Sequence, residues 1–321
     1  MRVLVTGANG FVGRAVVGRL LAQGHGVVAA TRRPAAGGGD QRVSWHAVGE
    51  VDAATDWSHA LAGVDGVIHL VARTHQAGEG ADAQDLYWAV NVEGTRRLAA
   101  QARAAGVGRL LYVSSVKAQA ERTHRPLRED DPPRPEDIYG QTKLEAERAL
   151  ADALADSGTR YTVLRPPLVY GPGVQANLRQ LACLTLAGWP LPFGRVDNQR
   201  SLIAVRNLAD LAVHALSDPR AADRTYLAAD GVDLSTPDLV RRIARAGDRR
   251  ARLLPVPVGW LALALRLLGR SGMADRLLGS LCVDMGRVGN ELGWRPPVTV
   301  DQEMAAMVNS LRAETTGEGG S

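Results

Sequence analysis

The sequence contains few cysteines, few aromatic residues and no hydrophobic run long enough to cross a bilayer. Its two cysteines, Cys183 and Cys282, form no CxxC motif and no cluster with histidines, so we expect a reducing compartment and no metal site. Trp260 to Leu268 is the most apolar stretch and is far too short to span a membrane. We expect it to form a helix that packs in the core or lines a pocket, and we expect no membrane partner.

The sequence also lacks a strong charge bias and a recognisable targeting segment. The formal net charge is +4, and basic and acidic residues are interspersed without a lysine-rich tail. A nucleic-acid-binding protein would need a clustered basic face, so we expect no such partner and assign the arginines to a small anionic ligand. Met1 to Val5 leads directly into a predicted strand, with no signal-peptide pattern, which favours a cytoplasmic location.

Short apolar runs alternate with amphipathic segments through the first half of the chain. This alternation predicts an α/β fold with a Rossmann-type, doubly wound parallel sheet. The predicted strands are Arg2–Thr6, Gly26–Ala30, Val43–Ala47, Gly66–Ala72, Arg109–Ser114 and Tyr161–Arg165. The predicted helices are Phe11–Ala22, a short one at Ala60–Leu61, Leu86–Ala105 and Tyr139–Ser157.

The alternation ends after Pro166, where an irregular Pro/Gly-rich segment begins. A helix is expected at Leu178–Ala187, strands that return to the sheet at Ser201–Val205 and Thr225–Ala228, and mainly helices from Ser235 to Leu292. Apolar residues make up 45% of the 321 residues, which is enough for a large domain with an appended lobe. We therefore predict a dinucleotide-binding domain (1–170 and about 200–231), a smaller, mainly helical C-terminal substrate lobe (171–199 and 232–313) and a disordered tail (314–321).

A glycine-rich turn, Thr6-Gly7-Ala8-Asn9-Gly10-Phe11-Val12-Gly13, joins the first predicted strand to the first helix. Glycines let the backbone approach a diphosphate, and the helix N-terminus offers free N–H groups with partial positive charge. The Gly-x-x-Gly-x-x-Gly spacing is one residue wider than the usual dinucleotide fingerprint, but its strand–turn–helix context supports the same role. The alternative is a tight turn that binds nothing. The predicted cofactor contacts here are Gly7, Asn9, Gly10, Phe11, Val12 and Gly13.

The second predicted strand is followed by Thr31, Arg32 and Arg33, without the carboxylate that usually binds the ribose 2′-hydroxyl of NAD. The two guanidiniums could instead contact a 2′-phosphate, or they are simply solvated loop charges. NAD and NADP both remain open, with a slight preference for NADP. Glu50 and Val51, after the third strand, are placed to contact the adenine.

Tyr139 and Lys143 are the candidates for proton transfer, with Ser115 upstream. Residues four apart on a helix share a face, so Lys143 can lie beside Tyr139. A phenol has a pKa of about 10, and acting as a base at neutral pH requires a shift of about three units, or roughly 4 kcal/mol. Lys143 and an oxidised nicotinamide could supply that shift, while Ser115 orients the same substrate oxygen. Lys143 could also hold the nicotinamide ribose.

With these motifs the chain resembles the extended short-chain dehydrogenase/reductase family, in its NAD-dependent epimerase/dehydratase branch. The resemblance covers nearly all of residues 1–313. It implies that Ser115, Tyr139 and Lys143 are catalytic. The further residues that it places at the cofactor are Leu70, Ala72, Asn91 and Pro166. The motifs that carry it are the glycine turn, His69-Leu70-Val71-Ala72, Asn91-Val92-Glu93-Gly94-Thr95, Ser114-Ser115, Tyr139 with Lys143, and Arg165 followed by Tyr170-Gly171-Pro172.

The resemblance also implies a UDP-binding second lobe and a homodimer. Arginines suit the diphosphate because a guanidinium pairs phosphate oxygens in a bidentate manner. The helices that correspond to Leu86–Ala105 and Tyr139–Ser157 would form the dimer interface. Phe193 could equally be an ordinary core residue. The implied substrate contacts, besides Ser115, are Asn177, Leu178, Leu191, Phe193, Arg200 and Arg276.

Two departures from the family pattern narrow the chemistry. Leu168 stands where many members have an asparagine that contacts the sugar diphosphate. Val116-Lys117 stands where sugar 4,6-dehydratases carry an Asp-Glu pair, so no carboxylates are placed to eliminate water. No Cys/His pair suggests 3,5-epimerisation, and we expect Cys183 to serve in packing.

The resulting hypothesis is hydride transfer at C4 of a nucleotide-linked hexose, preferably a UDP sugar used for surface polysaccharides. The similar members are bacterial UDP-hexose 4-epimerases and UDP-4-keto-6-deoxyhexosamine 4-reductases. The missing acidic residue after the second strand slightly favours a ketoreductase, because an epimerase must hold its NAD tightly. The alternatives are an NADP-dependent reductase of a non-sugar ketone and a non-catalytic NAD(P)-binding scaffold.

Overall fold

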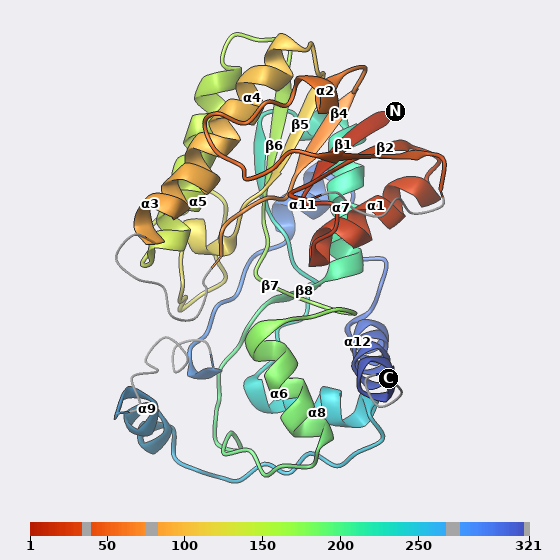
Figure 1. Cartoon of the computed structure of the whole chain (residues 1–321). Helices are drawn as coiled ribbons and strands as arrows, with labels where there is room; N and C mark the ends of the chain where they lie inside the picture. Colours follow the sequence, from red (N-terminus) through yellow and green to blue (C-terminus); the bar gives the residue numbers. More distant parts are fainter. Residues whose placement is uncertain (34–39, 75–82, 268–276, 318–321) are drawn as a thin grey trace.

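A seven-stranded parallel sheet forms the upper part of the molecule, and a smaller lobe lies below it (Figure 1). The computed structural model describes residues 1–33, 40–74, 83–267 and 277–317. The strand order is β3-β2-β1-β4-β5-β6-β9, as in a doubly wound sheet, so the predicted fold class is confirmed. The strands are β1 Arg2–Thr6, β2 Gly26–Thr31, β3 Val43–Ala47, β4 Gly66–His69, β5 Arg109–Val113, β6 Arg160–Arg165 and β9 Arg224–Leu227.

Helices cover both faces of the sheet because the central strands are apolar on both sides. On β1, Val3 and Val5 face a core shared with α1 (Phe11–Ala22) and α7 (Val205–Ser217). Leu4 faces the opposite core, shared with α4 (Gly94–Ala104) and α5 (Ile138–Leu154). Successive strand residues point to opposite faces, so continuous hydrophobic runs such as Val3-Leu4-Val5 produce this two-sided burial. The short α2 (Ser58–Leu61) also packs on the second face.

The predicted helix Leu86–Ala105 is interrupted. The structure divides this region into α3 (Ala83–Tyr87), a π-helical segment η1 (Trp88–Glu93) and α4. The prediction of one continuous helix therefore missed the π-helical segment. Such turns are frequent at functional sites, and this one contains the fully buried Asn91.

One strand predicted to return to the main sheet does not do so. β8 (Leu202–Ala204) instead pairs in parallel with β7 (Leu168–Tyr170), forming a separate two-stranded sheet. The prediction for Ser201–Val205 was wrong because β9 already occupies the free edge of β6. The prediction for Thr225–Ala228 was right, since β9 lies at that edge.

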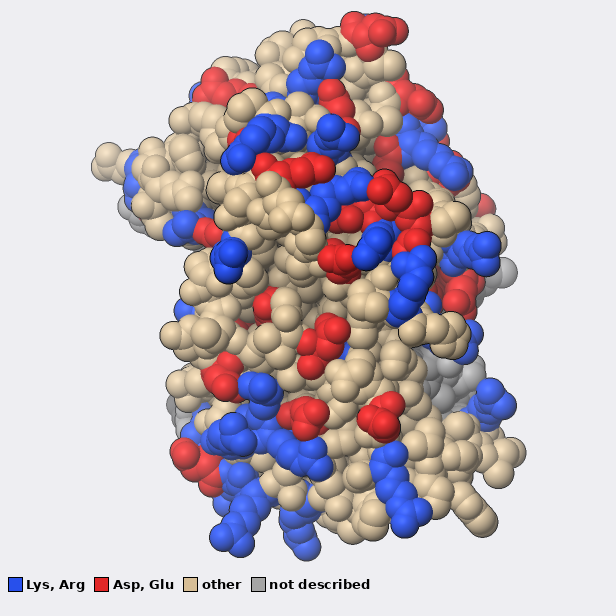
Figure 2. Space-filling view, turned by 180° about the vertical axis from the view of Figure 1, so that it is seen from behind, with Lys and Arg blue, Asp and Glu red and all other residues tan. Residues whose placement is uncertain are grey.

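The lower lobe is built from α6 (Ala176–Leu186), α8 (Thr236–Ala246) and α12 (Val300–Gly317) around a common apolar core. α12 continues to Gly317, so the helix enters the predicted disordered tail, and Arg179 pairs with Glu314 at 3.1 Å. Residues 318–321 lie outside the described residues. Figure 2 shows positive and negative side chains mixed over the upper domain.

The helix predicted near Trp260 forms as α9 (Val258–Leu267), but it is not packed in the core. Trp260 is 73% exposed and Leu267 is 79% exposed, so the prediction of a buried helix was wrong. Leu261 of α9 packs on the core of the lobe. Among the described residues, no helix combines the length and apolarity required to cross a membrane.

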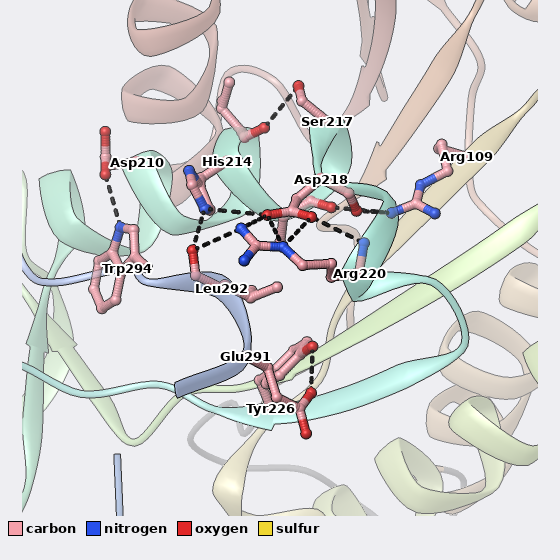
Figure 3. Close-up of polar contacts among 12 residues, drawn as sticks. Arg109, Asp210, His214, Ser217, Asp218, Arg220, Tyr226, Glu291, Leu292 and Trp294 are labelled. Carbon is pink, nitrogen blue, oxygen red and sulfur yellow. Dashed lines mark hydrogen bonds and ion pairs between the residues drawn. The ribbon is translucent and has the colours of Figure 1, made fainter. Parts of the chain in front are cut away.

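Close to its C-terminus the chain returns to the upper domain through α11 (Gly286–Leu292), as Figure 3 shows. Trp294 Nε1 donates to Asp210 on α7 at 2.8 Å, and Tyr226 on β9 donates to Glu291 at 2.9 Å. Val288, Leu292 and Trp294 join the core beneath α1 and α7. This segment therefore packs with the upper domain, although the sequence analysis assigned it to the lobe.

A buried ion pair connects the sheet to α5. Arg165, the last residue of β6, donates to Glu147 through Nε at 3.0 Å and through Nη2 at 2.5 Å. Both side chains are nearly inaccessible to solvent. Ser114 also donates to Glu147, and Gln119 accepts from Arg165 Nη1 at 2.9 Å. The network thus joins the ends of β5 and β6, the loop after β5 and the helix that carries Tyr139.

Replacing Arg165 with Met should lower the free energy of unfolding by about 3–5 kcal/mol, because it leaves the Glu147 carboxylate buried without its cation. Arg160→Met on the same strand is the matched control. Arg160 pairs with Asp223 at 2.9 Å, but both side chains are exposed, so its loss should cost about 0–1 kcal/mol. Urea unfolding of the three proteins measures both values, and equal losses would contradict the structural role of Arg165.

Candidate active site

The carboxyl ends of four neighbouring strands meet along one edge of the sheet. Gly7 follows β1, Leu70 follows β4, Ser114 follows β5 and Pro166 follows β6. In open parallel sheets ligands bind outside this edge, near the point where the strand order reverses. β1 and β4 form that switch point here, and residues predicted to bind the cofactor lie beside it.

The glycine turn has the geometry of a phosphate cradle. Gly7 adopts the left-handed backbone conformation (φ +67°), and Gly10 N donates to Gly7 O at 2.9 Å before α1 begins at Phe11. A Cβ atom on Gly13 would lie 2.1 Å from Gly7 O, so only glycine allows this close approach. Asn9 and Gly10 are exposed at the helix N-terminus, where N–H groups favour an anion.

A charged pair lies at the end of β2. Arg32 Nε is 3.3 Å from Glu50 Oε2, and both side chains are exposed. Thr31 is buried and its hydroxyl donates to Arg33 O at 2.7 Å, which shapes the turn after the strand. Val51 is buried, close to the backbone of Gly94. β2 itself ends without a carboxylate. Glu50, which follows β3, places one beside the end of β2.

Asn91 holds the segment that follows β4 in place beside the site. Its Oδ1 accepts from Arg73 N at 2.7 Å, and its Nδ2 donates to Arg73 O at 3.2 Å and to Thr142 Oγ1 at 3.0 Å. Ala72 immediately precedes Arg73, and Thr142 immediately precedes Lys143. Asn91 thus joins the segment after β4 to α5, and the π turn places this side chain in the interior.

The first turn of α5 is locked against the loop that carries Ser115. Asp137 caps α5 by accepting from Gly140 N at 2.7 Å, and it also pairs with Lys117 at 2.5 Å. Lys117 pairs in addition with Glu121 at 3.0 Å. A Cβ atom on Gly140 would lie 2.3 Å from Lys117 O, so the short helix η2 (Val116–Ala118) and α5 are in close backbone contact. This packing brings Ser115 and Tyr139 together.

Burial sets the charge states of the two predicted catalytic groups on α5. It raises the pKa of Tyr139 to about 12, although a hydrogen bond with Ser115 acts in the opposite direction. It lowers the pKa of Lys143 to about 7, partly offset by Glu147. Lys143 Nζ donates to Val113 O at 2.8 Å and lies 4.2 Å from the centre of the Tyr112 ring. In the protein alone, Lys143 is therefore directed towards β5, and burial determines the Tyr139 pKa.

A pocket of about 640 Å³ opens between the upper domain and the lobe. Ser115 and Tyr139 line it together with Asn177 and Arg200, so it joins the predicted proton-transfer residues to predicted substrate contacts. Arg200 Nη1 donates to Gly279 O at 2.9 Å, which holds its guanidinium at the wall. The remaining predicted substrate residues that line this pocket are Leu178, Leu191 and Phe193. Arg276 lies outside the described residues.

Several pocket residues could not be selected from the sequence. Ser235 caps α8, and the Ser-x-x-Asp pattern at 235–238 could predict that helix start but not its place at the pocket. Leu168, where many family members have asparagine, lines the pocket and offers no hydrogen bond there. The other polar residues that line it and were not predicted as ligands are Thr74, Lys117, Gln175, Gln180 and Thr236.

A glycine turn shaped for a diphosphate at the switch point of a parallel sheet, with a serine hydrogen-bonded to a tyrosine nearby, is the arrangement expected of a dinucleotide-dependent enzyme. The model of the NAD dependent epimerase/dehydratase family matches residues 3–229, and the chain belongs to this family. It is 39% identical to UDP-glucose 4-epimerase of Vibrio cholerae over 304 residues, which cover 94% of this chain and 92% of that protein.

Two further comparisons extend over almost the whole chain. The sequence is 29% identical to 2-alkyl-3-oxoalkanoate reductase of Stenotrophomonas maltophilia, covering 98% of this chain and 100% of that protein. The structure superposes on MoeE5 in complex with UDP-glucose and NAD with a TM-score of 0.77 and 25% identity, covering 98% of this chain and 100% of that one. Domain and lobe therefore occur together in related proteins.

Replacing Gly13 with Ala should destabilise the protein by about 2 kcal/mol or more, because the new methyl group would force the glycine turn apart. Gly18→Ala in the same helix is the control. A Cβ atom on Gly18 meets nothing within 4 Å, so alanine should be neutral or stabilise by up to about 1 kcal/mol. Urea unfolding compares the variants, and a neutral Gly13→Ala would contradict the close approach.

The buried Lys143 should make stability depend on pH. Its pKa falls from 10.5 to about 7 on folding, so between these values the unfolded chain binds a proton that the folded protein does not. Relative to Lys143→Met, the wild-type protein should therefore gain stability as the pH rises from 7 towards 10.5, by at most about 1.4 kcal/mol per unit. Urea unfolding across this range measures the difference, and a flat difference would show that Lys143 keeps its ordinary pKa.

Proposed function

We propose that the protein is a UDP-hexose 4-epimerase that keeps NAD bound through each turnover. The observation that carries this proposal is the single pocket lined by Ser115, Tyr139, Asn177 and Arg200. Proton transfer and recognition of an anionic ligand would then occur in one continuous space. The similarity to the Vibrio cholerae UDP-glucose 4-epimerase supports the same assignment.

The substrate side of the pocket suits a nucleoside diphosphate. A guanidinium such as that of Arg200 forms charge-assisted hydrogen bonds to phosphate oxygens. Apolar side chains, including Leu178, Leu191 and Phe193, provide flat contacts for a base, and Asn177 adds an amide. We assign the UDP moiety to these residues and the hexose to the space beside Tyr139.

The residues present fit NAD, which would be held by the glycine turn and the strand ends around it. We propose NAD in preference to NADP, reversing the slight preference drawn from the sequence. Glu50 partly neutralises Arg32, and its carboxylate would repel a 2′-phosphate placed at the end of β2. The MoeE5 structure, which contains NAD, agrees with this choice. When bound, NAD accepts a hydride from the sugar and returns it.

The proton at the C4 oxygen is moved by Tyr139. Ser115 holds the sugar hydroxyl while the tyrosine phenolate removes its proton as hydride leaves C4. This requires the pKa of Tyr139 to fall from about 12, to which Ser115 already contributes and to which a cationic nicotinamide would add. After the 4-keto sugar turns over in the pocket, Tyr139 donates the proton back to the same oxygen. The hydride returns to the opposite face, so no net oxidant or reductant is consumed.

Two other functions share this site. A UDP-sugar 4-ketoreductase would use the same residues but consume and release its cofactor. A reductase of an apolar ketone is favoured by the many leucines that line the pocket and by the similarity to 2-alkyl-3-oxoalkanoate reductase. Retention of Ser115, Tyr139 and Lys143 argues against a non-catalytic scaffold.

Two experiments distinguish these functions. The first denatures the purified protein and measures released cofactor, and the second incubates the native protein with UDP-hexoses. We expect stoichiometric NAD to be released, and NMR should show C4 epimers interconverting without added nucleotide. Product that forms only with NADPH would establish the ketoreductase instead. No thermal shift with millimolar UDP would favour the apolar ketone.

Tyr139→Phe should lower kcat by about 10²–10⁴-fold, because the ring remains but its proton-transfer group is lost. The bound NAD content and the unfolding midpoint should stay the same, since the substitution leaves the glycine turn intact. Tyr161→Phe on β6 is the control and should retain full activity. Epimerisation measured by coupled NADH formation gives both rates, and an active Tyr139→Phe would remove Tyr139 from the mechanism.

We also propose a homodimer formed through α4 and α5, which pack side by side on the outer face of the sheet (Figure 1). Leu86 and Trp88, on the adjoining α3 and η1, are exposed and would be covered by such an interface. Sedimentation velocity should show a dimer, and Trp88→Glu should shift it to a monomer. A monomeric wild-type protein would contradict this arrangement.

A further inference from the structure

α9 exposes an unusual amount of apolar surface. Arg266 is its one charged residue, and an exposed helix that is apolar around most of its circumference requires a cover. Trp260, Leu263 and Leu267 are 73%, 54% and 79% exposed. Leu261 anchors the helix by packing on the core of the lobe.

The apolar surface continues along the edge of the lobe. Trp189 is 62% exposed and Leu254 is 48% exposed. Their segments are adjacent, because Leu254 N donates to Leu191 O at 2.8 Å and Arg252 Nη1 donates to Gly188 O at 3.3 Å. The residues that we call the α9 surface are Trp189, Leu254, Val258, Trp260, Leu263 and Leu267.

Arginines lie close to this surface along the chain. Residues 249–267 contain no aspartate or glutamate, while Arg249, Arg250, Arg252 and Arg266 are all exposed. Within the described part of the chain, none of these four forms an ion pair with a carboxylate. Figure 2 shows both basic and acidic side chains over the lower half of the molecule.

We propose that the α9 surface binds peripherally to an anionic lipid bilayer. Tryptophan and leucine side chains would enter the interface between head groups and acyl chains, while the neighbouring arginines contact lipid phosphates. The same arginines oppose self-association, because a two-fold contact would bring like charges together. This replaces our expectation from the sequence that the protein has no membrane partner.

The attachment would bring the substrate pocket close to the bilayer. Leu261 packs on the same apolar cluster as Leu178, Leu191 and Phe193, which line the pocket. The helix that contacts lipid is thus attached to the pocket wall. The inference does not depend on which sugar or ketone the pocket accepts.

Cosedimentation of the full-length protein with vesicles tests the proposal. The protein should bind phosphatidylglycerol/phosphatidylcholine vesicles, bind pure phosphatidylcholine weakly and dissociate as salt increases. Two triple variants test the apolar and the electrostatic contributions to vesicle binding separately. The apolar variant is Trp260→Ser/Leu263→Ser/Leu267→Ser, and the α9 arginine variant is Arg249→Ser/Arg250→Ser/Arg252→Ser. Loss of three arginines should weaken binding on the order of a hundredfold.

Arg103→Ser/Arg160→Ser/Arg224→Ser is the matched charge control, since these three arginines are exposed on the upper domain. It should bind vesicles like the wild-type protein, and all variants should unfold at the wild-type temperature. The proposal is overturned if the wild-type protein ignores anionic vesicles, or if the control weakens binding as much as the α9 arginine variant. It is also overturned if the apolar variant retains vesicle binding but changes a dimer to a monomer, because α9 would then be an interface between copies.

Discussion

The rest of the site depends on the ion pair between Arg165 and Glu147. Neither charge could remain unpaired in so little solvent, so β6 and α5 are held in one relative position. Glu147 also accepts from Ser114, and Arg165 also donates to Gln119, so the loop after β5 is fixed by the same pair. Ser115 lies within that loop, and Tyr139 lies in the first turn of α5. The relative position of Ser115 and Tyr139, the two groups proposed to transfer the proton, therefore depends on this structural ion pair.

The same burial moves two pKa values in opposite directions and favours the neutral form of both groups. The pKa of Tyr139 rises to about 12, while that of Lys143 falls to about 7. The protein alone therefore keeps Tyr139 protonated. In the proposed mechanism a cationic nicotinamide would help Tyr139 to ionise, which would link proton removal to the oxidised state of the cofactor. An acidic phenol in the protein alone would lack that control.

The sequence predicted features that are determined locally and missed those determined by packing. The β1–Gly7–α1 unit follows from apolar runs and glycine spacing, and Tyr139 and Lys143 share a face because they lie four apart. The pairing of β8 could not be predicted, because it depends on β9 occupying the edge of β6. The approach of Glu50 to Arg32 likewise depends on the neighbouring strands. Spacing also could not show that Lys143 would be buried against Tyr112.

Among the described residues, α9 is a helix whose sequence favours burial more strongly than the fold allows. Covering its apolar side chains would be favourable at about 25 cal/mol per Å², yet Trp260, Leu263 and Leu267 stay exposed. Arg249, Arg250, Arg252 and Arg266 have no carboxylate partner among the described residues, although other arginines of the lobe, such as Arg241 and Arg242, do. Exposed apolar side chains are unfavourable in water, and an anionic bilayer would cover them while its phosphates contact the arginines, which is the reason for proposing lipid as the occupant of this surface.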